Sequence, residues 1–102
     1  MGRAAQRRYT APPQQFKVMD IMDPAEITGL IEKGFANAIV KVASDDNTHF
    51  QALVVADEFT GKRRIARHQL VYRTLGRLVG NEIHALSIRA LTPEEWRELG
   101  GG

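Results

Sequence analysis

Three histidines are the side chains best suited to chemistry in this 102-residue sequence: His49, His68 and His84. The chain contains no cysteine, which excludes a thiolate nucleophile, a zinc–thiolate site and an iron–sulfur cluster held by its own sulfur atoms. Imidazole is a good ligand for iron and zinc. Metal ligation is therefore one reading of these residues, and a packed or solvated structural role for each ring is the other.

The sequence lacks the motifs of common enzyme classes. It has no glycine-rich phosphate loop and no His-Glu-x-x-His pair. Its only serines are Ser44 and Ser87, and no His–Asp arrangement can be argued around Ser44. The adjacent Asp45 and Asp46 are more typical of a solvated turn than of a catalytic pair. We therefore expect a protein that is not an enzyme.

A run of unopposed positive charge lies between Glu58 and Glu82. It contains Lys62, Arg63, Arg64, Arg67, Arg73 and Arg77. The first four of these could contact nucleic-acid phosphates. They could also form the solvated side of an amphipathic helix, and this reading is favoured because residues 18–102 carry 10 basic and 12 acidic side chains.

Residues 1–17 have the composition of a tail. They hold Arg3, Arg7, Arg8 and Lys17 without an acid, together with two prolines and no apolar periodicity. We expect a flexible N-terminal tail over 1–19 and one domain over 20–99, in a cytoplasmic protein. A mitochondrial presequence is the alternative. The longest apolar run is far too short to cross a membrane.

Helix signals occur at three places. Asp23-Pro24-Ala25-Glu26 has the pattern of a capping box and predicts a helix over about 24–34. The period from 64 to 79 is also helical. It places Ile65, His68, Val71, Tyr72, Leu75, Leu78 and Val79 on one side. Thr92-Pro93-Glu94-Glu95 opens a short final helix, in which Trp96 is expected to pack back on the body.

Strands are predicted over 38–43, 49–56 and 83–90. The turn-forming residues 44–48 join the first two strands as an antiparallel hairpin. The third strand follows a helix, so it should run parallel to the second. The expected fold is a two-layer α+β domain: a mixed three-stranded sheet with helices on one face.

The predicted sheet brings two histidines to one end. His49 and His84 lie near the starts of the second and third strands, which share an end of the sheet if the strands are parallel. Alternation along the strands places His49 on the face opposite the core and His84 on the core face. The geometry therefore permits a shared metal site without predicting one. His68 lies on the apolar side of its helix, where a packing role is expected.

Four segments in the second half of the chain resemble the BolA family in order and spacing. They are Phe59-Thr60-Gly61-Lys62, Arg67-His68-Gln69-Leu70-Val71-Tyr72, Ile83-His84-Ala85-Leu86-Ser87-Ile88 and Leu91-Thr92-Pro93-Glu94-Glu95-Trp96. The resemblance covers about residues 20–98. The hairpin Asp45-Asp46-Asn47-Thr48-His49-Phe50 is similar to the short-loop branch, of the IbaG/YrbA type.

The resemblance implies a KH-like type II topology, with a short helical turn around Glu58–Lys62. It also implies a monothiol glutaredoxin partner and a [2Fe-2S] cluster shared with that glutaredoxin and glutathione, in iron–sulfur maturation and iron regulation. The family's ligand histidine falls on His84. The second ligand falls on His49, with His68 as the alternative. The isolated chain, a monomer or weak homodimer, would hold no cluster. A cluster with histidines on one iron and thiolates on the other would have the ligand division of a Rieske centre.

The family has also been described as transcriptional regulators. That role implies DNA as a partner, contacted through Lys62, Arg63, Arg64 and Arg67 and the helix that follows. The chain lacks the Gly-x-x-Gly loop by which KH domains hold a nucleic-acid backbone. DNA binding is therefore the second functional expectation.

Overall fold

The computed structural model describes residues 22–83 and 85–101. Both the predicted tail over 1–19 and the candidate ligand His84 lie outside the described residues. In chain order, the elements are α2 (Pro24–Lys33), β1 (Ile39–Ala43), β2 (His49–Val55), the 3-10 turn η1 (Asp57–Phe59), α3 (Arg64–Leu75), the 3-10 turn η2 (Gly76–Leu78), β3 (Ala85–Leu91) and α4 (Pro93–Glu98).

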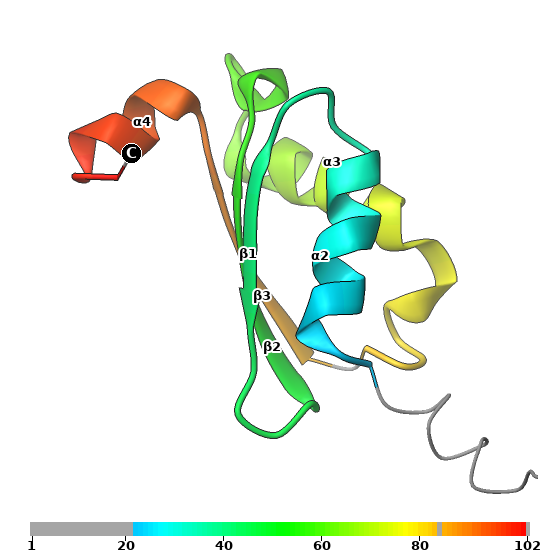
Figure 1. Ribbon diagram of the computed structural model, residues 1–102. Helices are drawn as coiled ribbons and strands as arrows, with labels where there is room; N and C mark the ends of the chain where they lie inside the picture. The colour runs from blue at the N-terminus through cyan, green and yellow to red at the C-terminus, as the bar shows by residue number, and fades with distance from the viewer. Residues whose placement is uncertain (1–21, 84, 102) are drawn as a thin grey trace, which may run out of the picture.

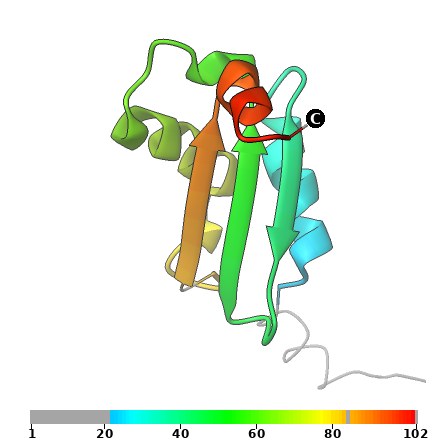
Figure 2. The ribbon, with the colours of Figure 1, turned by 90° about the vertical axis from the view of Figure 1, so that its left-hand side faces the viewer.

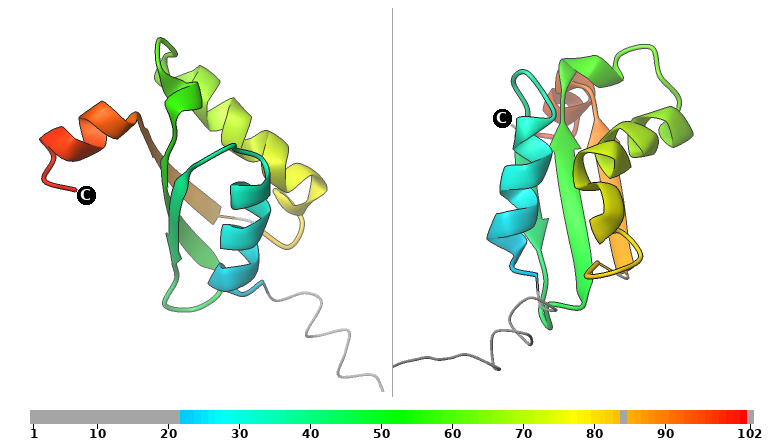
Figure 3. Two further views of the ribbon diagram at one scale, coloured as in Figure 1. Left: turned by 45° about the horizontal axis from the view of Figure 1, so that its top comes forward. Right: turned by 90° about the vertical axis from the view of Figure 1, so that its right-hand side faces the viewer.

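The three strands form one mixed sheet in the order β1-β2-β3. β1 and β2 are antiparallel, and β2 and β3 are parallel, which confirms both expected pairings. Helices α2 and α3 lie side by side over one face (Figures 1 and 3). The short α4 lies on the other side, beyond the end of β3 (Figure 2). The predicted α+β class, a mixed three-stranded sheet with helices, is confirmed.

Helix α2 begins as the sequence predicts. The Asp23 side chain accepts a hydrogen bond from the Ala25 N–H, and the Glu26 carboxylate accepts one from the Asp23 N–H. These reciprocal bonds satisfy backbone donors that a helix start leaves unpaired. The helix buries Ile27 and Ile31 against the sheet and ends at Lys33.

The core lies between the sheet and the two long helices. Its largest fully buried side chains are Phe50, Phe59, Ile27, Ile31, Ile83, Val54 and Val71. The rings of Phe35 and Phe59 meet edge to face, with centroids 5.4 Å apart. Because η1 carries Phe59 into the core, the segment after β2 is fixed before α3 begins.

Helix α3 differs from the prediction in length and in its buried side. It ends at Leu75 rather than Val79, since Gly76 has a φ of 55°, a left-handed conformation that breaks the helix. Ile65 is 72% exposed and Tyr72 39% exposed, although both were expected on the core side. Leu70, which was not among the residues expected on the core side, packs against the core. Only the arc of α3 that faces α2 and the sheet is covered.

Helix α4 is held at the end of the sheet by its own cap and by Trp96. The Thr92 hydroxyl accepts a hydrogen bond from the Glu95 N–H, and the Glu95 carboxylate accepts one from the Thr92 N–H. The Nζ atom of Lys41, in β1, lies 5.8 Å from the centroid of the Trp96 ring. Across residues 22–83 and 85–101, the structure has no helix that is long and apolar enough to span a membrane.

Candidate functional site

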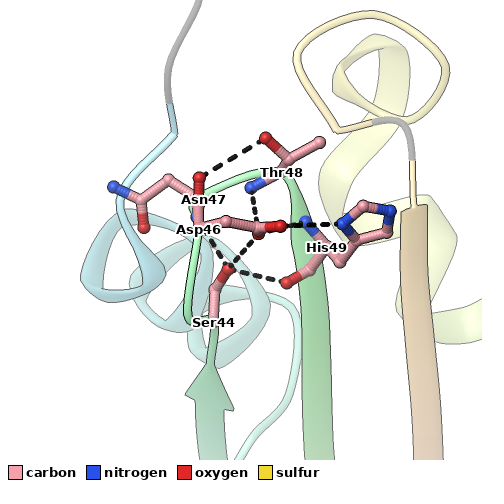
Figure 4. Close-up of polar contacts among 5 residues, drawn as sticks. All are labelled: Ser44, Asp46, Asn47, Thr48 and His49. Atoms are coloured by element: carbon pink, nitrogen blue, oxygen red, sulfur yellow. Dashed lines mark hydrogen bonds and ion pairs between the residues drawn. The ribbon is translucent and has the colours of Figure 1, made fainter.

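The loop between β1 and β2 is organised around Asp46. Its Oδ1 atom accepts hydrogen bonds from the Thr48 and His49 N–H groups, each at 2.9 Å, and from the Ser44 hydroxyl at 3.3 Å. Asn47, between them, has a left-handed φ of 56°, which asparagine tolerates well. The turn-forming residues therefore build a defined loop at the point where β2 begins (Figure 4).

The other carboxylate oxygen of Asp46 holds the imidazole of His49. Oδ2 lies 3.0 Å from Nδ1, and the His49 side chain is 73% exposed. The pKa of Asp46 is lowered, first by the hydrogen bond from the His49 N–H, then by the His49 side chain and the Thr48 N–H, because all three stabilise the charged carboxylate. At the start of β2, an exposed ring is thus held by one of its nitrogens.

His49 faces away from the core, as alternation predicts. Phe50, Ala52 and Val54 of β2 are buried, whereas His49 and Gln51 are exposed on the opposite face. In the parallel register, the Cα partner of His49 is Ala85, the first residue of β3. In Figure 4 the ring lies between the starts of the two strands. His84 directly precedes Ala85 in the sequence.

His68 lies in a different part of the molecule. It lines a groove near the C-terminal half of β3, from Ile88 to Leu91, whereas His49 pairs with the first residue of that strand. A seven-residue strand is about 20 Å long. The pKa of His68 is lowered by burial and, to a smaller degree, by the positive charge of Arg64. The fold therefore does not bring His68 to the His49 end of the sheet.

The chain offers few metal ligands at any one place. Within the described part of the chain, no group of three or more histidine, aspartate or glutamate side chains could hold a metal ion. His49 is exposed and aligned with the start of β3, so it could serve as one ligand of a group completed by another molecule. A cysteine-free chain suits a site whose thiolates come from a partner.

Three of the four predicted nucleic-acid contacts are exposed. Lys62, Arg63 and Arg64 lie in the turn before α3 and in its first turn. Among residues 22–83 and 85–101, no side chain caps the N-terminus of this helix, and its first turn contains no acid. The helix dipole and the unpaired backbone N–H groups at this end add to the positive potential of the three cations. This end of α3 can therefore attract an anion.

Arg67 does not belong with these cations. Its side chain is only 15% exposed, and its guanidinium donates hydrogen bonds to the Lys62 and Ala90 carbonyls and to the Glu95 carboxylate. The Nη1–Oε1 distance to Glu95 is 2.7 Å. Arg67 is therefore a structural residue, which corrects its placement in the predicted phosphate-binding set.

The same ion pair closes one side of a groove of about 560 Å³ between α3, β3 and α4. Lys62 and Arg64 line it together with Glu95 and Glu98. The hydrogen bond from Arg67 is the largest cause that lowers the pKa of Glu95, to about 2. Glu95 is thus charged at neutral pH, and the groove carries both signs of charge.

Sequence reasoning missed the role of Asp46 in placing His49. It treated the two adjacent aspartates as a solvated turn. The signal that could have separated them is spacing: an aspartate three residues before His49, followed by Asn47, a residue suited to left-handed backbone. Asp45 makes no hydrogen bond with any other part of the chain that the structure describes.

Comparison with known proteins gives a family for this fold and these residues. The model of the BolA-like protein family matches residues 31–95. The match includes the β1–β2 loop, the first turn of α3 and the first half of α4. The chain therefore belongs to the BolA family, as its four sequence segments indicated.

Individual relatives agree with this assignment. The chain is 35% identical over 83 residues to the DNA-binding transcriptional regulator BolA of Vibrio cholerae, covering 81% of this chain and 74% of that protein. It is 38% identical over 84 residues to the acid stress protein IbaG of Escherichia coli, covering 78% and 99%. The structure of a bolA protein homologue from Coxiella burnetii has a TM-score of 0.67 and 35% identity, covering 76% and 99%.

Proposed function

We propose that this chain is a non-enzymatic adaptor that binds a monothiol glutaredoxin and supplies histidine ligands to a shared [2Fe-2S] cluster, in iron–sulfur maturation and iron regulation. His84 is the first ligand and His49 the second. Glutathione and the glutaredoxin cysteine supply the sulfur ligands. In this role, the chain works in the cytoplasm.

The parallel pairing of β2 with β3 is the observation that supports this proposal. It makes His49 the register partner of Ala85, next in sequence to His84. Neighbouring strands lie about 4.8 Å apart, so ligands at two adjacent strand starts can reach one iron atom if His84, which precedes β3, turns to the face on which His49 lies. The exposure of His49 leaves its ring accessible to a second protein.

Membership in the BolA family, together with the ligand count, favours a shared cluster over one bound by the chain alone. An iron–sulfur cluster takes four protein or thiol ligands, and two histidines supply half of them. The absence of cysteine makes an outside source of thiolate necessary. Histidine on one iron and thiolate on the other raises the reduction potential relative to an all-thiolate cluster.

The test is an anaerobic titration followed by visible absorption and circular dichroism. The full chain is added to a glutathione-ligated [2Fe-2S] glutaredoxin homodimer. We expect a new visible circular-dichroism spectrum with the wild type and its loss with His84→Ala, while far-ultraviolet circular dichroism shows that the variant is folded. His49→Ala should weaken the new spectrum.

His68→Gln is the matched control, because it removes a histidine that lies away from the strand starts. It should behave like the wild type. An unchanged spectrum with His84→Ala would remove the ligand assignment. No spectral change with the folded wild type would refute the adaptor proposal.

DNA binding is the second candidate function, and one observation favours it. Lys62, Arg63 and Arg64 surround an uncapped helix N-terminus, which is a suitable place for a phosphate. The Vibrio cholerae relative bears the name of a DNA-binding regulator. In this reading, the exposed cations contact the nucleic-acid backbone, and Arg67 only supports the groove wall.

A further inference from the structure

We propose that Asp46 is a positioning residue that fixes the tautomer of His49, so that the Nε2 atom is the one that ligates. This inference rests on the proposed function, since it names how the second ligand is prepared. It concerns the tautomer and orientation of one ring, which the ligand assignment leaves open.

The geometry of the pair carries the inference. The Oδ2 atom of Asp46 lies 3.0 Å from Nδ1 of His49. An ionised carboxylate only accepts hydrogen bonds, so Nδ1 must carry the proton. The lone pair of the neutral ring is then on Nε2, which makes no hydrogen bond with the other described residues. A carboxylate behind a histidine is the usual partner of a metal-ligating imidazole.

The ring direction agrees with this role. Figure 4 shows Asp46 on the Nδ1 side of the ring, with the start of β3 on the other side. Ala85, the register partner of His49, carries only a methyl group. Nε2 is therefore presented on the outer face of the sheet, next to the start of β3, where a second protein can approach.

Folding stability does not explain the contact between Asp46 Oδ2 and His49 Nδ1. The two side chains are 73% and 53% exposed, and exposed pairs of this kind contribute little to folding. The loop itself is closed by the other oxygen, Oδ1, which accepts the Thr48 and His49 N–H groups. The two oxygens of one carboxylate thus have separable tasks.

This separation makes Asp46→Asn a sharp test. The Asn carbonyl oxygen can keep the Oδ1 bonds to the backbone, because those donors require an acceptor. The amide nitrogen then replaces Oδ2 and can only donate to the ring. Nδ1 must become the acceptor, so the proton moves to Nε2, while the loop keeps its hydrogen bonds.

The experiment uses nitrogen-15 NMR of the full chain alone, at about pH 8, where an ordinary imidazole is neutral. We expect the wild-type ring of His49 to be protonated on Nδ1 and the Asp46→Asn ring to be protonated on Nε2. Asp45→Asn removes the adjacent charge, and it should leave the wild-type tautomer unchanged.

The second measurement is the glutaredoxin titration described above. Asp46→Asn should lower the apparent affinity of the chain for the cluster-bearing glutaredoxin about tenfold, a typical effect of losing the hydrogen-bond partner of a ligand. Asp45→Asn should leave this affinity unchanged. An Asp46→Asn ring that stays protonated on Nδ1 would overturn the proposal. An Asp46→Asn variant with a reversed tautomer but an unchanged affinity in the titration would also overturn it. Failure of the wild type to change the cluster spectrum would instead refute the proposed function, and the NMR result would still decide what Asp46 does.

Discussion

The guanidinium of Arg67 joins α3 to α4 through Glu95, with Nη1 2.7 Å from Oε1 and Nη2 3.3 Å from Oε2. The same guanidinium donates to the Ala90 carbonyl at 3.0 Å and, through Nε, to the Lys62 carbonyl at 2.8 Å. One side chain thus connects the turn before α3, the end of β3 and the first turn of α4.

Arg67→Ala should destabilise the domain by about 2 kcal/mol, because it leaves a carboxylate and two carbonyls without their donor. Arg67→Lys should recover little of this loss, since one ammonium cannot match the planar arrangement of the guanidinium. Urea unfolding of the two variants measures both effects. Wild-type stability in Arg67→Ala would show that the hydrogen bonds of this guanidinium do not contribute to folding.

The same pair predicts a dependence of stability on pH. The pKa of Glu95 is about 2 in the folded chain, below its ordinary value of 4.5. Its lowered pKa adds stability that is fully present above about pH 5 and is lost as the pH falls from 4.5 towards 2. Glu95→Gln keeps the cap on Thr92, so its stability deficit should be constant near neutrality and should vanish across that interval. A deficit independent of pH would contradict the ion pair.

Two glycines of the first helix region should respond in opposite ways to alanine. A Cβ atom on Gly34 would overlap the Thr74 methyl of α3, whereas one on Gly29 meets nothing within 4 Å. We expect Gly34→Ala to cost about 1–3 kcal/mol by overpacking and Gly29→Ala to add about 0.5–1 kcal/mol by helix propensity. Thermal unfolding checks both, and Thr74→Ala should relieve the cost of Gly34→Ala.

Binding to duplex DNA should depend on Lys62, Arg63 and Arg64 and not on Arg67. Replacing Lys62, Arg63 and Arg64 by serine should lower affinity for duplex DNA at low salt and reduce the salt slope by about one for each residue. Arg67→Ala should leave the slope unchanged wherever the domain stays folded. An unaltered affinity in the triple variant would place any DNA contact elsewhere.

A bulky residue beside His49 should block cluster sharing without unfolding the chain. Ala85 is the register partner of His49, on the outer face of the sheet. Ala85→Leu should lower the apparent affinity measured in the glutaredoxin titration by roughly tenfold. This is the scale on which metal affinity responds to changes around the ligands. Ser87→Leu places the same bulk further along the same face and should have a much smaller effect.

Local signals predicted much of this fold. The capping pairs Asp23–Glu26 and Thr92–Glu95 involve residues three apart, so the sequence alone identifies them. The parallel pairing of β2 and β3 followed from the helix that connects the two strands. Helical periodicity, in contrast, could not say how wide an arc of α3 would be covered, and Ile65 and Tyr72 were misplaced for that reason.

The contacts that decide the site depend on distant partners or on details of a loop. Arg67 looked like its neighbours because Glu95, which neutralises it, lies 28 positions further along the chain. The pairing of Asp46 with His49 depends on the left-handed backbone of Asn47, which the composition of a turn allows but does not require. The liganding roles of His49 and His84 remain predictions.

The parallel pairing of β2 and β3 also affects when the site can form. All of α3 lies between these strands in the chain, so their starts meet only after a long loop has closed. Contacts of such high sequence separation form slowly. A chain still emerging from the ribosome would carry His49 long before the residues of β3 are available. If His49 and His84 are ligands as proposed, the pair marks completed folding, and an unfinished chain could not capture a cluster through it.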